Sequence, residues 1–483
     1  MTVKEPIKPT SPIKQTNPIK PTRKFQSDSG RMSRDLGHRI RVQTAMGKYD
    51  AVRTTTQGRF QDWQAARQAA SETKYEAVNH LDSYLEEFAR NTEAHGTKVY
   101  WAADADDACA YILDLCKRIG AKELIKSKSM TTEEIHLNRA LEAAGYGVVE
   151  SDLGEYIVQL RDEAPYHLVF PAMHLSRGEI SETFTKELGT PASDSPEELT
   201  MIARGVMRAK YLSADIGISG ANFAVAETGM ISITENEGNA RLTTSVPRVH
   251  VALLGIEKVL PKLSDLALFL PMLATAGTGQ ALTCYNSLLG GPRQPGEADG
   301  PEEFHVILLD NGRTDLLADP EQRDALHCIR CGACLNVCPI FKNVGGHSYG
   351  TTYQGPIGSV ITPHLNDLQE WKHLSAASTL CGACTETCPV GIDLHHHLLQ
   401  NRRNAAAAKP NPFEEKAFKA FAFLMTHPAL YRWVMHIAPF IQPFHRLVNG
   451  RKIDPLYGWT QSREFPNVKQ RTFKDYWAER EKR

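Results

Sequence analysis

The 483-residue sequence has no apolar run of about 18 residues, the length that a helix needs to cross the hydrocarbon core of a membrane. We therefore expect no transmembrane segment. Residues 1–24 are rich in Lys, Pro and Thr and contain no apolar stretch like that of a secretory signal peptide, which predicts a cytoplasmic protein. The formal net charge is only −1, and no helix-turn-helix or basic reading helix is recognisable. Nucleic-acid binding is therefore not expected.

A nicotinamide or flavin site is not recognisable either. The segment Gly277-Thr278-Gly279-Gln280 lacks the third glycine of a dinucleotide-binding loop, and no predicted strand precedes it. The sequence therefore predicts no resident hydride carrier of this kind.

Cysteine, in contrast, is concentrated in one region. Seven of the ten cysteines form two runs, Cys328-x2-Cys331-x2-Cys334-x3-Cys338-Pro339 and Cys381-x2-Cys384-x3-Cys388-Pro389. This spacing is typical of iron-sulfur proteins, because closely spaced thiolates on a tightly coiled backbone hold one cluster, while the last one, before proline, reaches the next cluster. Disulfides would need an oxidising compartment, and zinc is usually bound by paired knuckles with four ligands in total.

The two runs are therefore expected to exchange their last cysteines. One 4Fe-4S cluster would be held by Cys328, Cys331, Cys334 and Cys388, and a second by Cys338, Cys381 and Cys384.

The second set is one thiolate short, because Ser378 stands where a full repeat has its first cysteine. A serine hydroxyl is seldom deprotonated, so we expect the fourth iron to be open or to have a non-cysteine ligand. Cys284 is the next candidate for that ligand. Cys109 and Cys116 lie on the apolar stripe of a helix predicted over residues 105–119, and they are predicted to be core residues.

Three consecutive histidines, residues 395–397, also suggest a metal site. On a helix they would point in three directions, so we do not expect them to converge on one ion.

Domain boundaries follow from composition and periodicity. Residues 1–45 contain Pro-Ile-Lys three times and little apolar surface, which predicts a disordered basic tail. Residues 46–95 have apolar side chains at helical spacing. Over 96–290 strands and helices alternate, as in an α/β domain with a parallel sheet. Within it we predict, among other elements, a helix at 132–145 and strands at 156–160 and 167–171.

Beyond the α/β domain, Pro and Gly mark a linker over residues 291–325. The two cysteine runs define a domain over 326–400. Residues 401–483 have apolar helical stretches that prolines are expected to break, and their aromatic content predicts a packing or partner surface.

A ligand site in the α/β domain is predicted at Lys126, Lys128 and Glu227. Both lysines follow a strand and precede a helix whose Thr131-x-x-Glu134 fits a capping box, so free N–H groups and two ammonium groups would hold a carboxylate or phosphate. Glu227 lies between two apolar strands, where a carboxylate would line a cleft. The alternatives are solvated lysines and a glutamate that only makes hydrogen bonds.

The cysteine runs and seven other segments together resemble the lactate-utilisation iron-sulfur protein family, LutB, from about residue 45 onward. The segments are Lys126-Ser-Lys-Ser-Met130, Asp152-Leu-Gly-Glu-Tyr156, Gly217-Ile-Ser-Gly-Ala-Asn-Phe223, Ala226-Glu-Thr-Gly229, Asn236-Glu-Gly-Asn239, Gly255-Ile-Glu-Lys258 and Leu309-Asp-Asn-Gly-Arg313.

This resemblance implies an α/β lactate-utilisation domain related to the sugar-phosphate isomerase and CoA-transferase fold, followed by an α-helical ferredoxin-like dicluster 4Fe-4S domain. It also implies two partners, a cysteine-rich heterodisulfide-reductase-like subunit and a second subunit with a lactate-utilisation domain. Together they would oxidise L-lactate to pyruvate. The family's second run likewise has three cysteines.

We therefore expect an electron-transfer subunit with two 4Fe-4S clusters and no catalytic residue of its own. The alternative is a stand-alone hydroxyacid dehydrogenase whose substrate lies near Lys126, Lys128 and Glu227. Lactate oxidation releases two electrons at once, whereas a cubane normally accepts one. A flavin, nicotinamide or redox disulfide must therefore act between them, which argues against the alternative.

Overall fold

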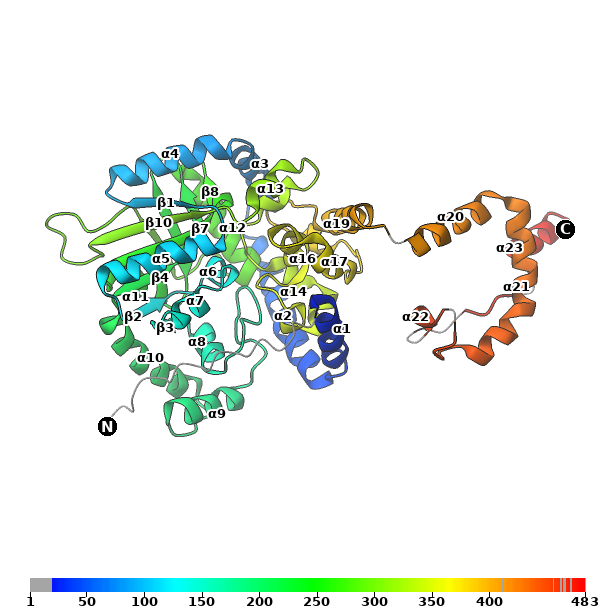
Figure 1. Cartoon of the computed structure of the whole chain (residues 1–483), viewed down its shortest axis with the longest axis horizontal. Coiled ribbons are helices and arrows are strands. Elements are labelled where there is room, and N and C mark those ends of the chain that lie inside the picture. Colours follow the sequence, from blue (N-terminus) through cyan, green and yellow to red (C-terminus); the bar gives the residue numbers. More distant parts are fainter. Residues whose placement is uncertain are drawn as a thin grey trace. The chain divides into compact units, whose positions relative to one another are not determined.

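The structure is a computed structural model, and it describes residues 20–410, 412–454, 456–460, 463, 466–469 and 471–482. The chain divides into two units, Met1–Ala405 and Ala406–Arg483. The predicted fold class is confirmed in the first unit, where an α/β part with a parallel sheet is followed by a helical part that carries the cysteine runs (Figure 1).

A six-stranded sheet forms the centre of the α/β part. Its order is β1-β10-β7-β4-β2-β3, and all neighbouring strands are parallel. Alternate residues of β7 face opposite sides of the sheet, so Leu253 shares a buried cluster with Ile112 while Leu254 shares another with Phe88. Both faces are thus buried, which explains the continuous apolar runs of these strands. The strands are β1 (Lys98–Ala102), β2 (Glu123–Lys126), β3 (Gly147–Glu150), β4 (Ile216–Ser219), β7 (Val249–Gly255) and β10 (Glu303–Leu309).

A four-stranded sheet, β8-β5-β6-β9, packs beside this core. Two helices cover it: Ala77 of the first and Leu81, Leu85 and Phe88 of the second are buried in the same cluster as Ile231 and Val259. The elements are α3 (Trp63–Asn79), α4 (Leu81–Ala94), β5 (Phe223–Val225), β6 (Met230–Glu235), β8 (Val259–Leu260) and β9 (Tyr285–Leu289).

The remaining helices of the α/β part are mostly amphipathic. Cys109 and Cys116 of α5 are buried, as predicted, and burial raises the pKa of each thiol to about 11. These helices are α5 (Ala105–Ile119), α6 (Met130–Glu134), α7 (Leu137–Ala143), α8 (Leu153–Leu160), α9 (Arg177–Leu188), α10 (Pro196–Ser213), α11 (Asn239–Ser245) and α12 (Leu266–Thr278).

The predicted linker over 291–325 differs from the structure. Its Pro- and Gly-rich loop is followed by β10, which lies between β1 and β7 in the main sheet. Phe304, Val306 and Leu308 of β10 are almost fully buried. The loop is therefore an excursion within the α/β part, which continues through Leu309.

Three predicted elements within the α/β part are also wrong. Residues 156–160 belong to the helix α8 and not to a strand, and residues 167–171 form turns. The helix predicted at 132–145 is two helices, α6 and α7, because His136 has a left-handed backbone (φ 52°) that ends the first one.

The predicted disordered tail is wrong for its described residues, 20–45. Residues 20–45 are mostly helical, within α1 (Pro21–Met32) and α2 (Leu36–Gln57). Val42 and Met46 of α2 are buried in the same cluster as Cys331, and α2 packs against α12 and two helices of the cysteine region. Tertiary burial therefore stabilises helices that their composition did not reveal. The Pro-Ile-Lys repeat, except Lys20, lies outside the described residues.

The cysteine region is a group of short helices that shares its core with α2 and α12. Its helices are α13 (Arg313–Ala318), α14 (Ala333–Val337), α15 (Pro339–Val344), α16 (Gly355–Leu365), α17 (Leu368–Ala376), α18 (Ala383–Thr387) and α19 (Leu394–Ala408).

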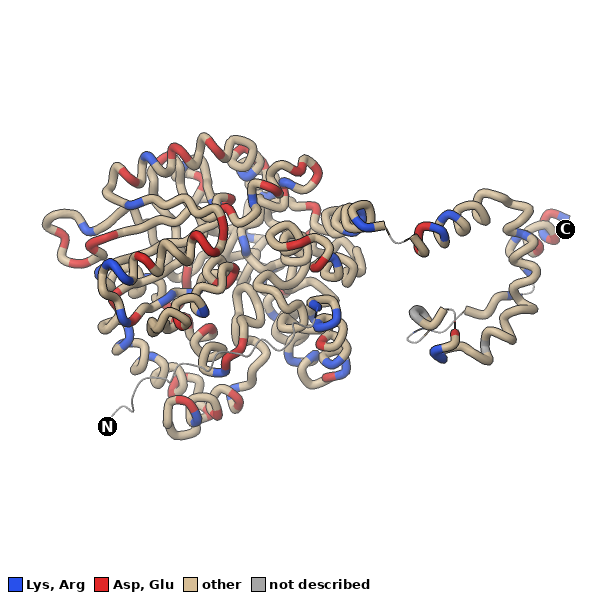
Figure 2. The backbone as a smooth tube through the Cα atoms, viewed as in Figure 1, with Lys and Arg blue, Asp and Glu red and all other residues tan. Residues whose placement is uncertain are grey.

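The second unit consists of helices with many exposed aromatic side chains, among them Phe413, Phe418 and Trp433. Figure 2 shows that α21 has few charged residues. Pro439 and Pro443, which we expected to break the helix, lie inside α21. Among the described residues, no helix combines the length and apolar character needed to cross a membrane. The helices are α20 (Pro412–Thr426), α21 (Pro428–Val448), α22 (Tyr457–Thr460) and α23 (Phe473–Glu481).

Candidate functional site

The two cysteine runs have the same backbone conformation. In each, a non-glycine residue in the left-handed region precedes a cysteine, and a left-handed glycine follows it. The pairs are Arg330 (φ 59°) with Gly332 (φ 79°) and Leu380 (φ 54°) with Gly382 (φ 83°). A left-handed backbone is uncommon at residues other than glycine. Its occurrence at equivalent positions of the two runs therefore shows that both runs coil in the same way.

Each coil continues into a one-turn helix and ends at a cysteine before proline. Gly332 begins α14, Gly382 begins α18, and the two helices pack against each other. Cys338 and Cys388 end them with nearly equal backbone angles. The last cysteine of each run thus lies where the two coils meet.

Ser378 has the place in the second run that Cys328 has in the first. The backbone N–H of Arg330 donates to Cys328 Sγ at 3.4 Å, and that of Leu380 donates to Ser378 Oγ at 3.1 Å. The backbone around Ser378 thus repeats the backbone around Cys328, and the two positions differ in having an oxygen in place of a sulfur.

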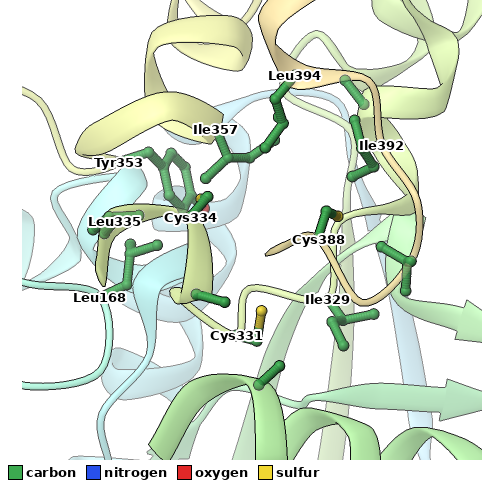
Figure 3. Packing of buried hydrophobic residues seen from close by; sticks show 14 of the residues in the cluster. Leu168, Ile329, Cys331, Cys334, Leu335, Tyr353, Ile357, Cys388, Ile392 and Leu394 are labelled. Atoms are coloured by element: carbon green, nitrogen blue, oxygen red, sulfur yellow. The ribbon is translucent and has the colours of Figure 1, made fainter. Parts of the chain in front are cut away.

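The four predicted ligands of the first cluster lie close together. Burial raises the pKa of the Cys331 thiol, and the nearby charges of Cys388 and Cys328 raise it further. Burial likewise raises the pKa of Cys334, with contributions from Cys328 and Cys331. Figure 3 shows Cys331, Cys334 and Cys388 among apolar side chains such as Ile329. The first run and the end of the second thus converge in one part of the core.

The three predicted ligands of the second cluster line one cavity, together with Ser378 and His395. Burial raises the pKa of the Cys384 thiol to about 12, and the charges of Cys338 and Cys381 contribute. Cys284 does not line this cavity; it is exposed, and its N–H donates to Asn236 Oδ1.

Buried charged residues surround the first run. Arg330 forms an ion pair with Glu257 (Nη2 to Oε1, 3.2 Å), and the Lys74 ammonium donates to the Glu257 carbonyl oxygen at 2.6 Å. Burial lowers the pKa of Lys74 to about 7 and that of Lys258 to about 8. Burial opposes the ionisation of Glu257, but Arg313 and Arg330 outweigh it and lower its pKa to about 2.

Arg313 connects Glu257 to Glu134, a second buried carboxylate of the α/β part. Its Nε lies 2.5 Å from Glu257 Oε2, and its two Nη atoms contact both carboxylate oxygens of Glu134 at 2.8 and 2.9 Å. Tyr353 also donates to Glu134, at 2.5 Å. Buried charges of this kind must be paired, and this network pairs them across four segments of the chain.

The structure places Lys126 in an ion network of its own. Its side chain is 0% exposed, and Nζ lies 2.8 Å from Glu150 and 3.0 Å from Glu133. Burial would lower the pKa of Lys126, but these two carboxylates outweigh it and raise the pKa. The ammonium charge is thus already balanced by protein carboxylates.

The other two residues of the predicted ligand site also have protein partners. Lys128 Nζ donates to the Val169 carbonyl at 2.7 Å, and the exposed Glu227 accepts the Leu263 N–H at 2.8 Å. No contact among Lys126, Lys128 and Glu227 occurs in the described part of the chain. The helix N-cap is Ser129, which accepts from the Thr132 N–H, so the predicted capping box at Thr131 is wrong.

Two of the three consecutive histidines come closer together than we predicted. The ring centroids of His395 and His396 are 4.2 Å apart, and the rings stack. Both rings contact the carboxylate of Asp393, the residue before Leu394, at which α19 begins. His397 points elsewhere, with Nε2 2.8 Å from Asp324. The expectation that all three do not converge is confirmed, but the first two share a carboxylate.

A second histidine group lies between the α/β part and the cysteine region. Ligand atoms of Glu163, His174 and His347 lie within 4.8 Å of one another. The group is already satisfied in part, since His174 pairs with Glu163 at 2.8 Å and His347 donates to the Ala164 carbonyl at 2.7 Å.

Sequence reasoning missed the charged network and His395. Glu257 and Arg313 stand in the segments Gly255-Ile-Glu-Lys258 and Leu309-Asp-Asn-Gly-Arg313, which were distinctive but had no predicted role. In the sequence, the only indication of this network was that Glu257 and Arg313 are charged residues next to apolar segments. Their convergence depends on the tertiary fold.

Comparison with known proteins agrees with this architecture. Residues 85–309 match the model of the LUD domain, residues 324–392 that of a 4Fe-4S dicluster domain, and residues 395–482 that of the C-terminal region of lactate utilisation protein B. The LUD match ends where β10 ends.

Curated relatives are similar over most of their length. Lactate utilization protein B of Bacillus licheniformis is 43% identical over 448 residues, covering 91% of this chain and 93% of that protein. The Bacillus subtilis protein of the same name is 43% identical, over 87% of this chain and 88% of its own. A solved structure of a DUF162 family protein from Deinococcus radiodurans covers 47% of this chain and 98% of its own, with 14% identity and a TM-score of 0.28.

Proposed function

The chain belongs to the lactate utilization protein B family, and from this membership we propose that it is the electron-transfer subunit of a complex that oxidises L-lactate to pyruvate. We propose that it binds two 4Fe-4S clusters in the cytoplasm. Its partners would be a cysteine-rich heterodisulfide-reductase-like subunit and a second subunit with a lactate-utilisation domain.

The observation that carries the proposal is the repeated cysteine motif. Two runs with the same coil, helix and terminal cysteine pack against each other, and they fall within the matched 4Fe-4S dicluster domain. A zinc site built from two paired knuckles would need only two cysteines in each run, whereas these runs have four and three. Two adjacent clusters that exchange a ligand account for it.

The donor set fits this cofactor. All seven thiols of the runs are free, and soft thiolate donors in two neighbouring groups suit iron-sulfur clusters. Cys328, Cys331, Cys334 and Cys388 would hold one cluster, and Cys338, Cys381 and Cys384 the other. When bound, such a cluster takes up and returns one electron at a time.

The surrounding residues determine how easily an electron is accepted there. Apolar side chains of α2, α12 and α16 exclude water from the first set of thiols. Arg330, Lys74 and Lys258 bring positive charge close to Cys328, which offsets the negative charge of thiolate ligands. The positive charge favours the reduced, more negative state of a bound cluster, whereas the exclusion of water opposes it.

The partner requirement follows from electron counting. Lactate gives up two electrons together, so a two-electron carrier must precede one-electron centres. The chain has no recognisable dinucleotide loop, and we assign the carrier to the cysteine-rich partner. The alternative, a stand-alone hydroxyacid dehydrogenase, needs free charges near Lys126, Lys128 and Glu227, whereas these side chains already have protein partners.

An anaerobic reduction assay tests the proposal. L-lactate should leave the visible absorbance of the isolated chain unchanged and should bleach it once both partner subunits are added. Cys331→Ser should lose iron and activity, whereas the exposed control Cys284→Ser should retain both. Rapid bleaching of the isolated chain by lactate would favour the dehydrogenase alternative.

A further inference from the structure

The second set of thiols lacks a fourth cysteine, and an imidazole also lines the cavity that these thiols line. Besides Cys338, Cys381 and Cys384, the cavity is lined by Ser378 and by the imidazole of His395. Histidine replaces cysteine as an iron ligand in Rieske centres, so an imidazole is a chemically reasonable partner for three thiolates.

The hydrogen bonds of His395 leave one ring nitrogen available. Nδ1 lies 2.9 Å from Asp393 Oδ1 and 2.8 Å from Thr385 Oγ1. An ionised carboxylate can only accept a hydrogen bond, so it favours the tautomer with the proton on Nδ1. In the described part of the chain, no protein group hydrogen-bonds Nε2. Its lone pair is therefore free.

This arrangement is the one that metal-binding histidines usually have. A ligating imidazole commonly donates its other N–H to a carboxylate, which fixes the ring and makes the free nitrogen more basic. The Thr385 hydroxyl adds a second restraint, because it also accepts the backbone N–H of His395 at 3.2 Å. Thr385 directly follows Cys384, so the ring is tied to the coil that carries the thiols.

Ser378 is the competing ligand, because it occupies the place of Cys328 in the repeat. Its oxygen is already an acceptor for the Leu380 N–H at 3.1 Å. To bind iron it would have to lose its proton, and an alkoxide is a harder, more basic donor than the thiolates beside it. A neutral imidazole binds without deprotonation.

We propose that His395 binds the fourth iron of the second cluster through Nε2, with Asp393 and Thr385 holding the ring in place. This inference rests on the proposed assignment of Cys338, Cys381 and Cys384 to that cluster. A neutral ligand in place of a thiolate also makes the cluster less negative, so its reduction potential should lie above that of the first cluster.

The test is pulsed EPR of the reduced, anaerobically purified full-length chain, in which histidine has been labelled with 15N. The second cluster should have a nitrogen coupling that changes with the label. This coupling should be lost in His395→Ala and remain in His396→Ala, the matched control on the same helix turn. Ser378→Ala should also retain it.

Iron content provides the second measurement. His395→Ala should lose about one iron of roughly eight on exposure to air, as the second cluster becomes a three-iron form with its own EPR signal. In that background, Ser378→Cys should restore the four-iron cluster without the nitrogen coupling, which also demonstrates that the variant folds.

The outcomes separate this inference from the proposed function. Two clusters without histidine coupling, or coupling that survives in His395→Ala, would overturn the role of His395 and leave the cysteine assignment intact. Loss of one iron in air from Ser378→Ala, but not from His395→Ala, would point to the serine. Iron for only one cluster in the wild-type chain would contradict the two-cluster assignment itself.

Discussion

Among single residues, Arg330 has the most direct influence on the first cysteine run. It lies between Cys328 and Cys331 in the sequence, has a left-handed backbone, and pairs with Glu257. Its guanidinium also lies over the Tyr353 ring, 4.5 Å from the centroid. The side chain thus fixes a positive charge beside the thiols through two separate contacts.

We predict that Arg330→Gln lowers the reduction potential of the first cluster by roughly tens of millivolts, because a nearby positive charge stabilises the added electron. EPR-monitored redox titration measures both clusters in one sample. Arg403→Gln, at an exposed position, is the control and should leave both potentials unchanged. An unchanged first potential in Arg330→Gln would show that the charge is screened or replaced.

His250 gives a pH prediction far from the cysteines. It is buried on β7, stacks on Phe304, and lies 2.7 Å from Ser219 Oγ. Burial lowers its pKa to about 3. Below about pH 6.5 the unfolded chain therefore takes up a proton that the folded chain refuses, so this residue destabilises the fold as the pH falls.

His250→Gln removes this titration. The stability advantage of the wild type over the variant should shrink by about 1.4 kcal/mol between about pH 7.5 and 5.5, because one pKa unit corresponds to that free energy. Urea unfolding at both pH values measures it, and the other histidines cancel in the comparison. An equal difference at both pH values would mean that His250 titrates alike when folded and unfolded.

At the scale of elements, the two cysteine coils repeat each other but have different surroundings. A Cβ added at Gly332 would lie 3.0 Å from Val169 and 3.2 Å from His167, whereas one added at Gly382 would meet nothing within 4 Å. Both glycines have positive φ, so alanine strains both coils equally.

Gly332→Ala should therefore reduce iron content and thermal stability more than Gly382→Ala. The shared backbone strain is about 1–2 kcal/mol, and only the first variant adds a steric conflict with the α/β part. Iron analysis and unfolding midpoints of the two variants measure the difference. Equal losses would indicate that backbone strain alone matters and that the packing around Gly332 adapts.

The elements predicted correctly from the sequence are those whose apolar periodicity and capping residues lie within the element itself. The helix at 105–119 has a regular apolar stripe, an Asp104 N-cap and a glycine C-cap, and it was predicted with its observed bounds. Strand β10 was missed because Pro and Gly in the preceding loop suggested a linker. The short strand predicted at 156–160 is α8, since a brief apolar run fits either structure.

The site divides in the same way. The cysteine motif, and the presence of Ser378 where the repeat has a cysteine, could be predicted from the spacing of residues along the sequence. Glu134, Glu257, Arg313 and Arg330 belong to four distant segments, and only the tertiary fold brings them together. His395 belonged to a histidine run that was interpreted from helix geometry alone, whereas its contacts depend on Asp393 and Thr385, which lie before the helix.

At the scale of the whole molecule, the α/β part and the cysteine region are one unit. Leu168 and Phe269 of the α/β part, together with Val42 of α2, share a cluster with Cys331 and Cys334. The cysteine region is therefore not a detachable module, and its thiols depend on packing contributed by the LUD domain.

The second unit, in contrast, should be dispensable for cluster binding. A chain that ends at residue 408, the end of α19, should retain the iron content and EPR spectrum of the full protein, because every cysteine lies in the first unit. Iron analysis of the purified truncated protein tests this. Loss of one or both clusters would show that residues 409–483 support the cysteine region.

We propose that this chain carries two iron-sulfur clusters that pass single electrons, and a reductive titration measures both the number of clusters and the electrons that they accept. The anaerobically purified protein should contain about eight irons and take up about two electrons per chain, in two separate steps. Stoichiometric zinc with negligible iron, or uptake of only one electron, would contradict the account.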